Sequence, residues 1–265
     1  MSARRRRDLS SREDAVTVVL VHGVPETSLV WDELVAALCE GGVVAPIRLS
    51  PPGFGVPIPQ GFEPTREGYV RWLIDELESL GEPVRLVGHD WGGLHVVGVA
   101  MTRPDLIESW VSDVVGIFDP GYRWHPLARR WQRPGAGEQA LSALVSMSDD
   151  ERIAYLCGQG MPRHLAGRLE CAIDATMSRC ILSLYRSAIQ PAMAEAAGSL
   201  PAAAARPGLA IHPTEDHNSG TREDVVRSAR RAGARVAELP GLGHWWFAQE
   251  PRRAATALHH FWGSR

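Results

Sequence analysis

The stretch of residues 84–93 constrains the fold of this chain more than any other part of the sequence. It reads Val-Arg-Leu-Val-Gly-His-Asp-Trp-Gly-Gly, which begins as a buried strand and turns directly into a helix over 92–102. Gly88 and Gly92 bracket the turn, and Asp90 lies at its apex. So sharp a turn brings backbone segments together and requires dihedral angles that a Cβ obstructs. We predict a strand whose end presents the Asp90 carboxylate; the plain alternative is an ordinary junction with an acidic helix cap.

Six short segments rich in apolar and β-branched residues are expected to form strands, and helical segments lie between most of them. Apolar runs without alternation are typical of parallel strands that are covered on both faces. Strands separated by helices predict right-handed βαβ units. The sequence therefore predicts an α/β fold with a mostly parallel six-stranded sheet and helices on both faces. The expected strands are 15–21, 43–49, 84–87, 110–117, 208–211 and 235–239.

Between residues 117 and 206 the pattern changes, because strand signals disappear and Trp, Met, Cys and Ala recur at helical spacing. A capping box begins one of the expected helices at Ser148. We expect 117–206 to form an all-helical lid inserted into a core made of 15–116 and 207–265. Residues 1–14, which include a run of four arginines, are expected to form a flexible, solvated arm.

The composition excludes several classes of function. With 28 Lys and Arg against 31 Asp and Glu, the formal net charge of -3 provides no basic face for nucleic acid or for an anionic membrane. No run of about 18 apolar residues is present to span a bilayer. The four cysteines form no Cys-x-x-Cys motif, which favours buried free thiols in a reducing, cytoplasmic location. Nothing has the spacing of a metal cluster, so we expect neither a metal nor an organic cofactor.

Three motifs stand in an order that suits covalent catalysis: Asp90 at the turn, an acid after the strand at 208–211, and His244 in a glycine-rich loop. Together with His22-Gly23-Val24-Pro25-Glu26-Thr27, they resemble the α/β-hydrolase superfamily over nearly the whole chain, in its order of nucleophile, acid and base. The motif Gly-His-Asp-Trp-Gly has aspartate where many hydrolases have serine. It resembles the branch with an aspartate nucleophile, which includes epoxide hydrolases and haloalkane dehalogenases.

This resemblance implies a role for each motif residue. Asp90 is the expected nucleophile, whose carboxylate forms an ester with the substrate. His244 is the expected general base that activates water against this ester. Asp216 is the expected acid that holds the imidazole in its working tautomer. Glu215 and Asp119 are alternatives to it, because the segment after the strand departs from the family pattern and some dehalogenases place this acid before the lid.

The resemblance also implies an oxyanion hole and a substrate pocket. The backbone amides of Val24 and Trp91 are the expected donors to the oxyanion. Pro25, Trp124 and Trp131 are expected to line the pocket. The lid is rich in Trp and Met, which indicates a small apolar substrate. We expect the chain to be a monomer or a homodimer.

The lid segment Leu184-Tyr185-Arg186-Ser187 resembles the segment in which epoxide hydrolases carry one of two catalytic tyrosines. Tyr185 is therefore the expected proton donor to the alkoxide that forms when an epoxide opens. The position of the second tyrosine falls near Leu127. A substitute donor is expected from Tyr122, Trp124, His125 or Trp131.

Several functions stay open at this point. An epoxide hydrolase is favoured, because His-Gly-Val-Pro-Glu-Thr is more similar to the epoxide hydrolase form of that motif. A haloalkane or haloacid dehalogenase is the first alternative, although Val24 stands where one dehalogenase group has a halide-binding asparagine. A biosynthetic relative or a small-molecule-binding protein is the second; the intact set of Asp90, His244 and an acid disfavours a pure binding protein.

Overall fold

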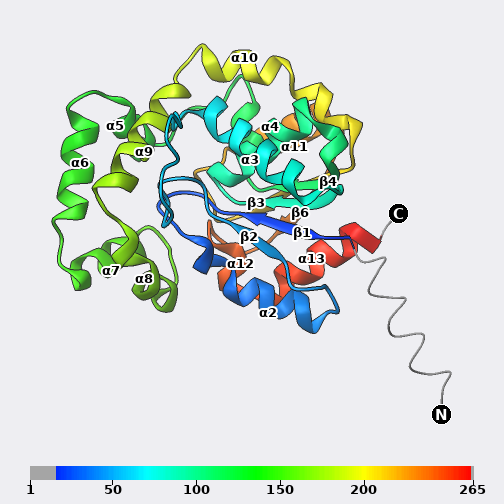
Figure 1. Cartoon of the computed structure of the whole chain (residues 1–265), viewed down its shortest axis with the longest axis horizontal. Coiled ribbons are helices and arrows are strands. Elements are labelled where there is room, and N and C mark those ends of the chain that lie inside the picture. The colour runs from blue at the N-terminus through cyan, green and yellow to red at the C-terminus, as the bar shows by residue number, and fades with distance from the viewer. Residues whose placement is uncertain (1–15, 264–265) are drawn as a thin grey trace.

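The computed structural model describes residues 16–263 and contains a sheet of six strands (Figure 1). The strand order is β2-β1-β3-β4-β5-β6, and every neighbouring pair is parallel. This arrangement confirms the predicted fold class. The strands are β1 (Val18–Val21), β2 (Ile47–Leu49), β3 (Val84–Gly88), β4 (Ile107–Ser112), β5 (Gly208–Pro213) and β6 (Ala234–Leu239).

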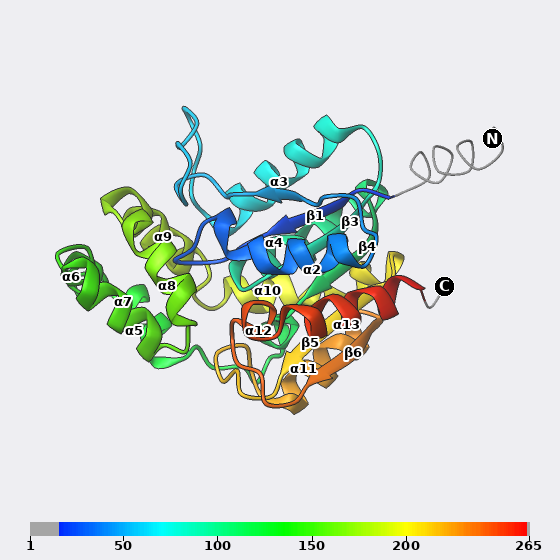
Figure 2. The same ribbon diagram turned by 90° about the horizontal axis from the view of Figure 1, so that it is seen from below.

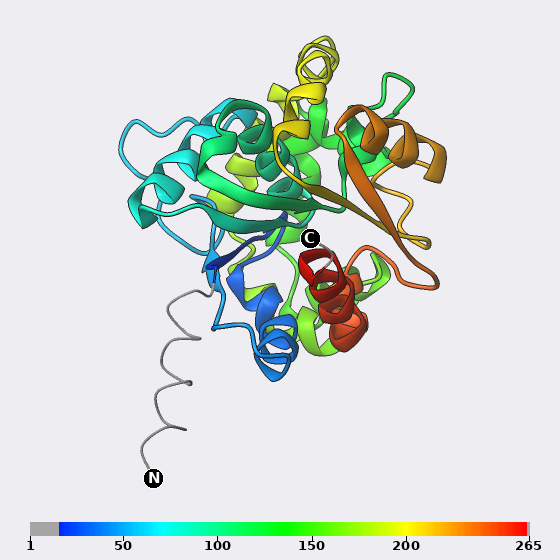
Figure 3. The same ribbon diagram turned by 90° about the vertical axis from the view of Figure 1, so that its right-hand side faces the viewer.

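Helices cover both faces of the sheet, because its central strands are apolar on both sides. Every residue of β1 and β5 is buried, as expected of parallel strands. Figure 3 shows the sheet between two layers of helices. One layer contains α3 (Arg66–Leu80), α4 (Trp91–Thr102) and α11 (Arg222–Arg231); the other contains α2 (Asp32–Glu40), α12 (Trp246–Gln249) and α13 (Pro251–Gly263) (Figure 1).

Helix α4 is the central helix of the core and begins directly after Asp90. Its residues from Trp91 to Ala100 are all buried, so no polar face is required. The chain leaves the helix at Arg103 and enters a 3-10 turn at Pro104, which cannot continue an α-helix. Because α4 is packed in the core and begins directly after Asp90, it fixes the position of Asp90 at the carboxyl end of β3.

The bounds of two expected strands were wrong. The segment expected at 43–49 forms a strand only at β2, and the segment expected at 110–117 is β4, which begins at Ile107 and ends at Ser112. The apolar run continues beyond β4 because the 3-10 turn Val115–Phe118 is also fully buried. An apolar run alone does not distinguish a strand from a buried turn. The expected arm and the start of the first expected strand, residues 1–15, lie outside the described residues.

A group of helices between β4 and β5 lies at one end of the sheet (Figure 1, Figure 2). The predicted capping box is present, since the Ser148 hydroxyl accepts from the Glu151 amide and the Glu151 carboxylate accepts from the Ser148 amide. Helix α10 (Ala192–Gly198) and the 3-10 turn Leu200–Ala205 lie instead beside the core, where Ala203 O accepts from Trp110 Nε1 at 3.1 Å. The lid boundaries at 117 and 206 stay a proposal. The helices of the group are α5 (Pro126–Gln132), α6 (Ala136–Val145), α7 (Asp149–Gly158), α8 (Arg163–Leu169) and α9 (Ala175–Ser187).

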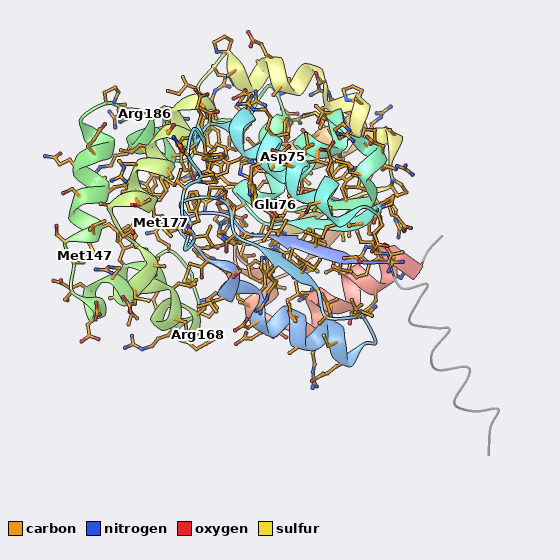
Figure 4. All side chains as sticks on the ribbon, viewed as in Figure 1. Asp75, Glu76, Met147, Arg168, Met177 and Arg186 are labelled. Carbon is orange, nitrogen blue, oxygen red and sulfur yellow. The ribbon has the colours of Figure 1, made fainter. Side chains whose placement is uncertain are left out.

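Ion pairs connect this group of helices to the core. Arg168 of α8 pairs with Asp32 of α2, and His164 Nε2 lies 2.7 Å from Glu33 Oε1. Figure 4 labels Arg168 at the rim of the group and Met177 within it. Because these pairs are solvent-exposed, each contributes little to stability, on the order of 0 to 1 kcal/mol. Burial of apolar side chains such as Met177 stabilises the group of helices more than these pairs do.

The four cysteines, Cys39, Cys157, Cys171 and Cys180, are all free, as the sequence predicted. Their expected burial was wrong except at Cys180, because Cys39 and Cys171 are exposed and Cys157 is half-buried. Within residues 16–263, no helix combines the length and apolar character needed to cross a membrane.

Candidate active site

Asp90 stands at a strained turn between β3 and α4. Its backbone has φ 50° and ψ -124°, and among residues 16–263 it is the one non-glycine residue with positive φ. Such a conformation is costly for a residue with a Cβ and is concentrated at functional sites. The turn requires glycine beside it, because a Cβ on Gly92 would collide with the backbone of Val21. This is the predicted elbow.

The Asp90 carboxylate contacts the loop that follows β1. Its Oδ2 accepts a hydrogen bond from the Val24 amide at 3.0 Å, as expected for an oxyanion donor. Trp91, the other predicted donor, contributes the first amide of α4. Burial raises the pKa of Asp90, and the positive charges of His244 and His89 and the Val24 amide oppose that rise. The Val24 amide therefore fixes the position of Oδ2, and burial keeps water away from the carboxylate. A fixed and desolvated carboxylate is suited to act as a nucleophile.

His244 and Asp216, the expected base and acid, contact each other. His244 Nδ1 lies 3.0 Å from Asp216 Oδ2, and Asp216 Oδ1 accepts from the Asn218 amide at 2.9 Å. Burial alone would raise the pKa of Asp216, but His244 lowers it well below its usual range. Burial would lower the pKa of His244, but Asp216 and Asp90 raise it. The imidazole is thus oriented with Nδ1 toward the carboxylate and Nε2 available for proton transfer.

The two alternative acids lie elsewhere. Glu215 is exposed and its carboxylate accepts from the Thr214 hydroxyl at 3.3 Å. Asp119 accepts from Arg227 Nε at 2.8 Å and from the Gly121 amide at 2.8 Å. Neither carboxylate contacts His244, whereas Asp216 does.

A cavity between the core and the helices α5, α6, α7 and α9 brings most of the predicted site residues together. The cavity has a volume of about 60 Å³. Its lining contains neither lysine nor arginine. Of the predicted residues, the cavity is lined by Asp90, His244, Tyr185, Val24, Pro25 and Trp131.

Tyr185 lies in α9 on the side of this cavity that the helices α5, α6, α7 and α9 form. It is 3% exposed, and its ring meets the rings of Trp91 and Trp131 edge-on at centroid distances of 5.0 Å and 4.9 Å. Burial and the nearby Asp90 charge raise the pKa of Tyr185 well above its ordinary value, while a hydrogen bond with the Trp91 side chain opposes the rise. The phenol therefore keeps its proton at neutral pH and can donate it.

Two of the expected substitute donors are already engaged. The Tyr122 hydroxyl donates to Asn218 O at 2.7 Å, and Trp124 Nε1 donates to Ala188 O at 3.3 Å. Trp124 does not line the cavity, so its expected place in the pocket was wrong; its ring instead stacks on Trp91 at 6.0 Å. Trp124 is turned away from the cavity because its indole N–H satisfies the Ala188 carbonyl at the end of α9, which has no partner within the helix.

His125, Trp131 and Tyr155 are further donors at the cavity, which Gln159 and Asn218 also line. Burial lowers the pKa of His125 to about 4, and its Nδ1 accepts from the Ala128 amide at 3.4 Å, so the neutral ring carries its proton on Nε2. Tyr155, in α7, lines the cavity and was not among the expected residues. Its sequence signal was hidden, because a tyrosine between Ile153 and Leu156 on a helical face looks like ordinary packing.

Comparison with known proteins identifies the family. A family model described as "Alpha/beta hydrolase family" matches residues 18–257. The chain belongs to the alpha/beta hydrolase family. It is a hydrolase on this ground, and its sheet order and helical layers are those of the family fold.

Individual relatives of this alpha/beta hydrolase are distant. The AB hydrolase superfamily protein YfhM of Bacillus subtilis is 31% identical over 111 residues, which are 39% of this chain and 37% of the relative. The chain thus matches less than half the length of this relative. Two solved structures resemble the fold over most of their length: an enol-lactonase from Burkholderia xenovorans (21% identity, TM-score 0.69, 95% and 92% of the two chains) and a candidate epoxide hydrolase from Pseudomonas aeruginosa (18% identity, TM-score 0.74, 94% and 89%).

The site of this alpha/beta hydrolase combines a carboxylate, an oriented imidazole and a buried phenol. In the described part of the chain, no group of three or more His, Cys, Asp or Glu side chains is placed to hold a metal ion. The carboxylate can attack an electrophilic carbon, the imidazole can accept a proton from water, and the phenol can donate a proton to a departing oxygen. All three side chains line the same cavity.

Proposed function

We propose that this protein belongs to the aspartate-nucleophile branch of its family and opens epoxides to diols through an ester on Asp90. The observation that carries the proposal is the protonated Tyr185 hydroxyl in the same cavity as Asp90 and the His244 imidazole. An epoxide that opens leaves an alkoxide, which requires an O–H donor. The cavity provides that donor on the lid side and the nucleophile on the core side.

In the first step, a carboxylate oxygen of Asp90 bonds to a ring carbon of the epoxide and the carbon–oxygen bond breaks. The electron pair of that bond goes to the epoxide oxygen, which takes the proton of Tyr185. The products are a hydroxyalkyl ester on Asp90 and a tyrosinate. Because Oδ2 is bound by the Val24 amide, Oδ1 is the attacking atom and Oδ2 becomes the ester carbonyl oxygen.

In the second step, His244 accepts a proton from water, and the resulting hydroxide bonds to the carbonyl carbon of the ester, which is Cγ of Asp90. Asp216 stabilises the imidazolium that forms. The tetrahedral intermediate places its negative charge on Oδ2, where the Val24 amide donates, and the amide of Trp91 is the second expected donor. Its collapse releases the diol, and the proton held by His244 returns through solvent to Tyr185.

The lining indicates a neutral substrate with both apolar and polar groups. The cavity contains Leu127, Leu144 and Leu156 together with Trp131, and it has no lysine or arginine to pair with a substrate carboxylate. His125 is neutral at pH 7, because burial lowers its pKa to about 4. A carboxylated substrate would lose hydration without gaining a lysine or arginine partner.

Halide chemistry is the competing function of the same carboxylate. A departing halide requires N–H donors and no proton. The Val24 amide already binds Asp90 and the Trp91 side chain hydrogen-bonds with Tyr185, whereas His125 and Trp131 place further N–H groups at the cavity. We place haloalkane dehalogenation second because halide chemistry leaves the Tyr185 O–H donor without a role.

Incubation of the purified protein with styrene oxide and, separately, with a bromoalkane tests the proposal. We expect diol from the epoxide and little or no released bromide. Bromide release that exceeds diol formation would make the protein a dehalogenase. If neither product forms, a specialised biosynthetic substrate or a binding role replaces the proposal.

Tyr185→Phe is expected to slow ester formation by about 10²-fold, because it removes the proton donor and keeps the ring contacts. Hydrolysis of the ester, which uses His244, is expected to keep its rate. Rapid-quench mass spectrometry of the Asp90 peptide separates the two steps. Tyr69→Phe is the matched control, since the buried Tyr69 hydroxyl donates to Pro52 O and does not line the cavity. Unchanged ester formation in the Tyr185 variant would remove this residue from the mechanism.

A further inference from the structure

His89 is the residue before the nucleophile, and the mechanism above does not use it. Its side chain is fully buried and does not line the cavity, so it has no access to substrate. Two buried carboxylates flank its ring. Nδ1 lies 2.5 Å from Asp113 Oδ2, and Nε2 lies 3.2 Å from Glu26 Oε1. Removing ionisable groups from water is costly even when they are paired. A buried cluster of one imidazole and two carboxylates therefore requires an explanation.

Asp113 connects His89 to the nucleophile. While Oδ2 binds the imidazole, Oδ1 accepts from the Asp90 amide at 2.9 Å. Trp246 Nε1 also donates to Oδ2, at 2.8 Å. A shift of the Asp113 carboxylate would therefore move the backbone of the strained turn that carries Asp90.

Glu26 connects His89 to the oxyanion loop. Its Oε2 accepts from the Gly23 amide at 3.1 Å, and its Oε1 accepts from Trp245 Nε1 at 2.6 Å. Gly23 directly precedes Val24, whose amide binds the Asp90 carboxylate. A shift of Glu26 would therefore displace the donor to the oxyanion.

The loop that carries the base reaches the same cluster. Trp245 and Trp246 follow His244 directly, and each donates its indole N–H to one of the two carboxylates. The rings of His89 and His244 lie 4.6 Å apart between centroids. The nucleophile turn, the oxyanion loop and the base loop thus converge on one imidazole.

We propose that His89 is a positioning residue that, through Asp113 and Glu26, holds the nucleophile, the oxyanion donor and the base in one fixed arrangement. The proposal rests on the proposed ester mechanism for its kinetic consequences. The charges of the two carboxylates support this role. Burial alone would lower the pKa of His89, but Asp113 and Glu26 raise it well above its ordinary value. The two neighbouring carboxylates therefore favour the protonated form of the ring.

The two ring nitrogens can be tested separately with two variants. In His89→Asn the side-chain amide nitrogen takes the place of Nδ1, so the Asp113 contact is kept and the Glu26 contact is lost. In His89→Gln the longer side chain reaches the place of Nε2, so the Glu26 contact is kept and the Asp113 contact is lost. The wild-type ring makes both contacts.

We expect the two variants to slow different steps with styrene oxide as the probe. His89→Gln loosens the Asp90 turn and should slow ester formation by about 10²-fold. His89→Asn loosens the oxyanion loop and should slow ester hydrolysis by about 10²-fold with a smaller effect on ester formation. Rapid-quench mass spectrometry of the Asp90 peptide gives both rates. Equal slowing of both steps by both variants, or no slowing, would overturn the proposal.

A titration of the His244 imidazole by nuclear magnetic resonance tests the arrangement without substrate. The titratable groups that face His89 are Glu26, Asp113, Asp90, His22 and His244. Since the His89 charge lowers the pKa of His244, both variants should raise that pKa. An unchanged pKa would contradict the proposal.

Matched controls separate positioning from folding. His95→Gln replaces another fully buried histidine, which burial keeps neutral with a pKa of about 3, and should leave both step rates and the His244 pKa unchanged.

If the His89 variants fail to fold, Trp246→Phe removes one N–H from Asp113 and keeps an aromatic ring. It should slow ester formation by about 10-fold and spare ester hydrolysis; equal rates to the wild type would overturn the proposal. Absence of any ester in the wild-type protein would refute the proposed function, and the His244 titration would still decide the role of His89.

Discussion

Asp90→Ala is expected to lose turnover by a factor on the order of 10⁵ while the protein stays folded. The loss follows because no other carboxylate of residues 16–263 lines the cavity: Asp216 is bound to His244 and the Asn218 amide and is not part of the lining. The fold is expected to survive because burial raises the pKa of Asp90, so this desolvated carboxylate opposes folding more than it supports it. Turnover is measured with styrene oxide and unfolding with thermal melts.

Alanine is preferred to asparagine at this position, because an asparagine could be hydrolysed back to aspartate by the water that His244 activates. Asp75→Ala is the matched control, since Asp75 is an exposed carboxylate on α3 (Figure 4). It should keep full activity. Substantial diol formation by the Asp90 variant would show that the reaction proceeds by direct attack of water.

His244→Gln is expected to slow ester hydrolysis by about 10³-fold and to leave ester formation nearly unchanged. The ester should therefore accumulate to one equivalent per protein, because only the second step requires the base. Intact-protein mass spectrometry detects it as an added mass equal to that of the epoxide. His164→Gln, at the surface pair with Glu33, is the control and should accumulate no ester. A variant of His244 that turns over without accumulation would exclude its role as base.

The pH dependence of ester hydrolysis follows from the same residue. The base acts in its neutral form, and Asp216 raises the pKa of His244 from the ordinary value of 6.5; the Asp90 charge, which also raises it in the free protein, is absent from the ester. Hydrolysis should therefore be slow below that pKa and increase as the pH rises through it. Asp216→Asn removes the main charge that raises this pKa, so its midpoint should move to lower pH. A midpoint that stays fixed would contradict the assignment of Asp216.

The sequence predicted the fold class because the period of its apolar residues is clear. Six strands alternate with helices, and Gly88 and Gly92 permit the turn at Asp90. The strand bounds were harder to predict at β4, since Val115–Phe118 is as apolar as the strand before it. A buried 3-10 turn and a buried strand both appear in the sequence as a short run of apolar residues.

The candidate site was predictable where a short motif defines the residue and its neighbours. Asp90, Val24 and His244 each lie in such a motif. Tyr155 could not be found in this way, because only the packing of α7 against the cavity distinguishes it from a tyrosine on any helix. Asp113 was missed for a similar reason, since its two contacts join the Asp90 amide and the His89 ring across different strands.

A single turnover of styrene oxide in heavy-oxygen water tests the central claim most directly. If the substrate carbon becomes bonded to Asp90, the oxygen from water enters the Asp90 carboxylate when the ester is hydrolysed. Mass spectrometry should then find the label in the peptide that contains Asp90 and none in the diol. Label in the diol alone, with an unlabelled peptide, would show that water attacks the substrate directly and would contradict the account.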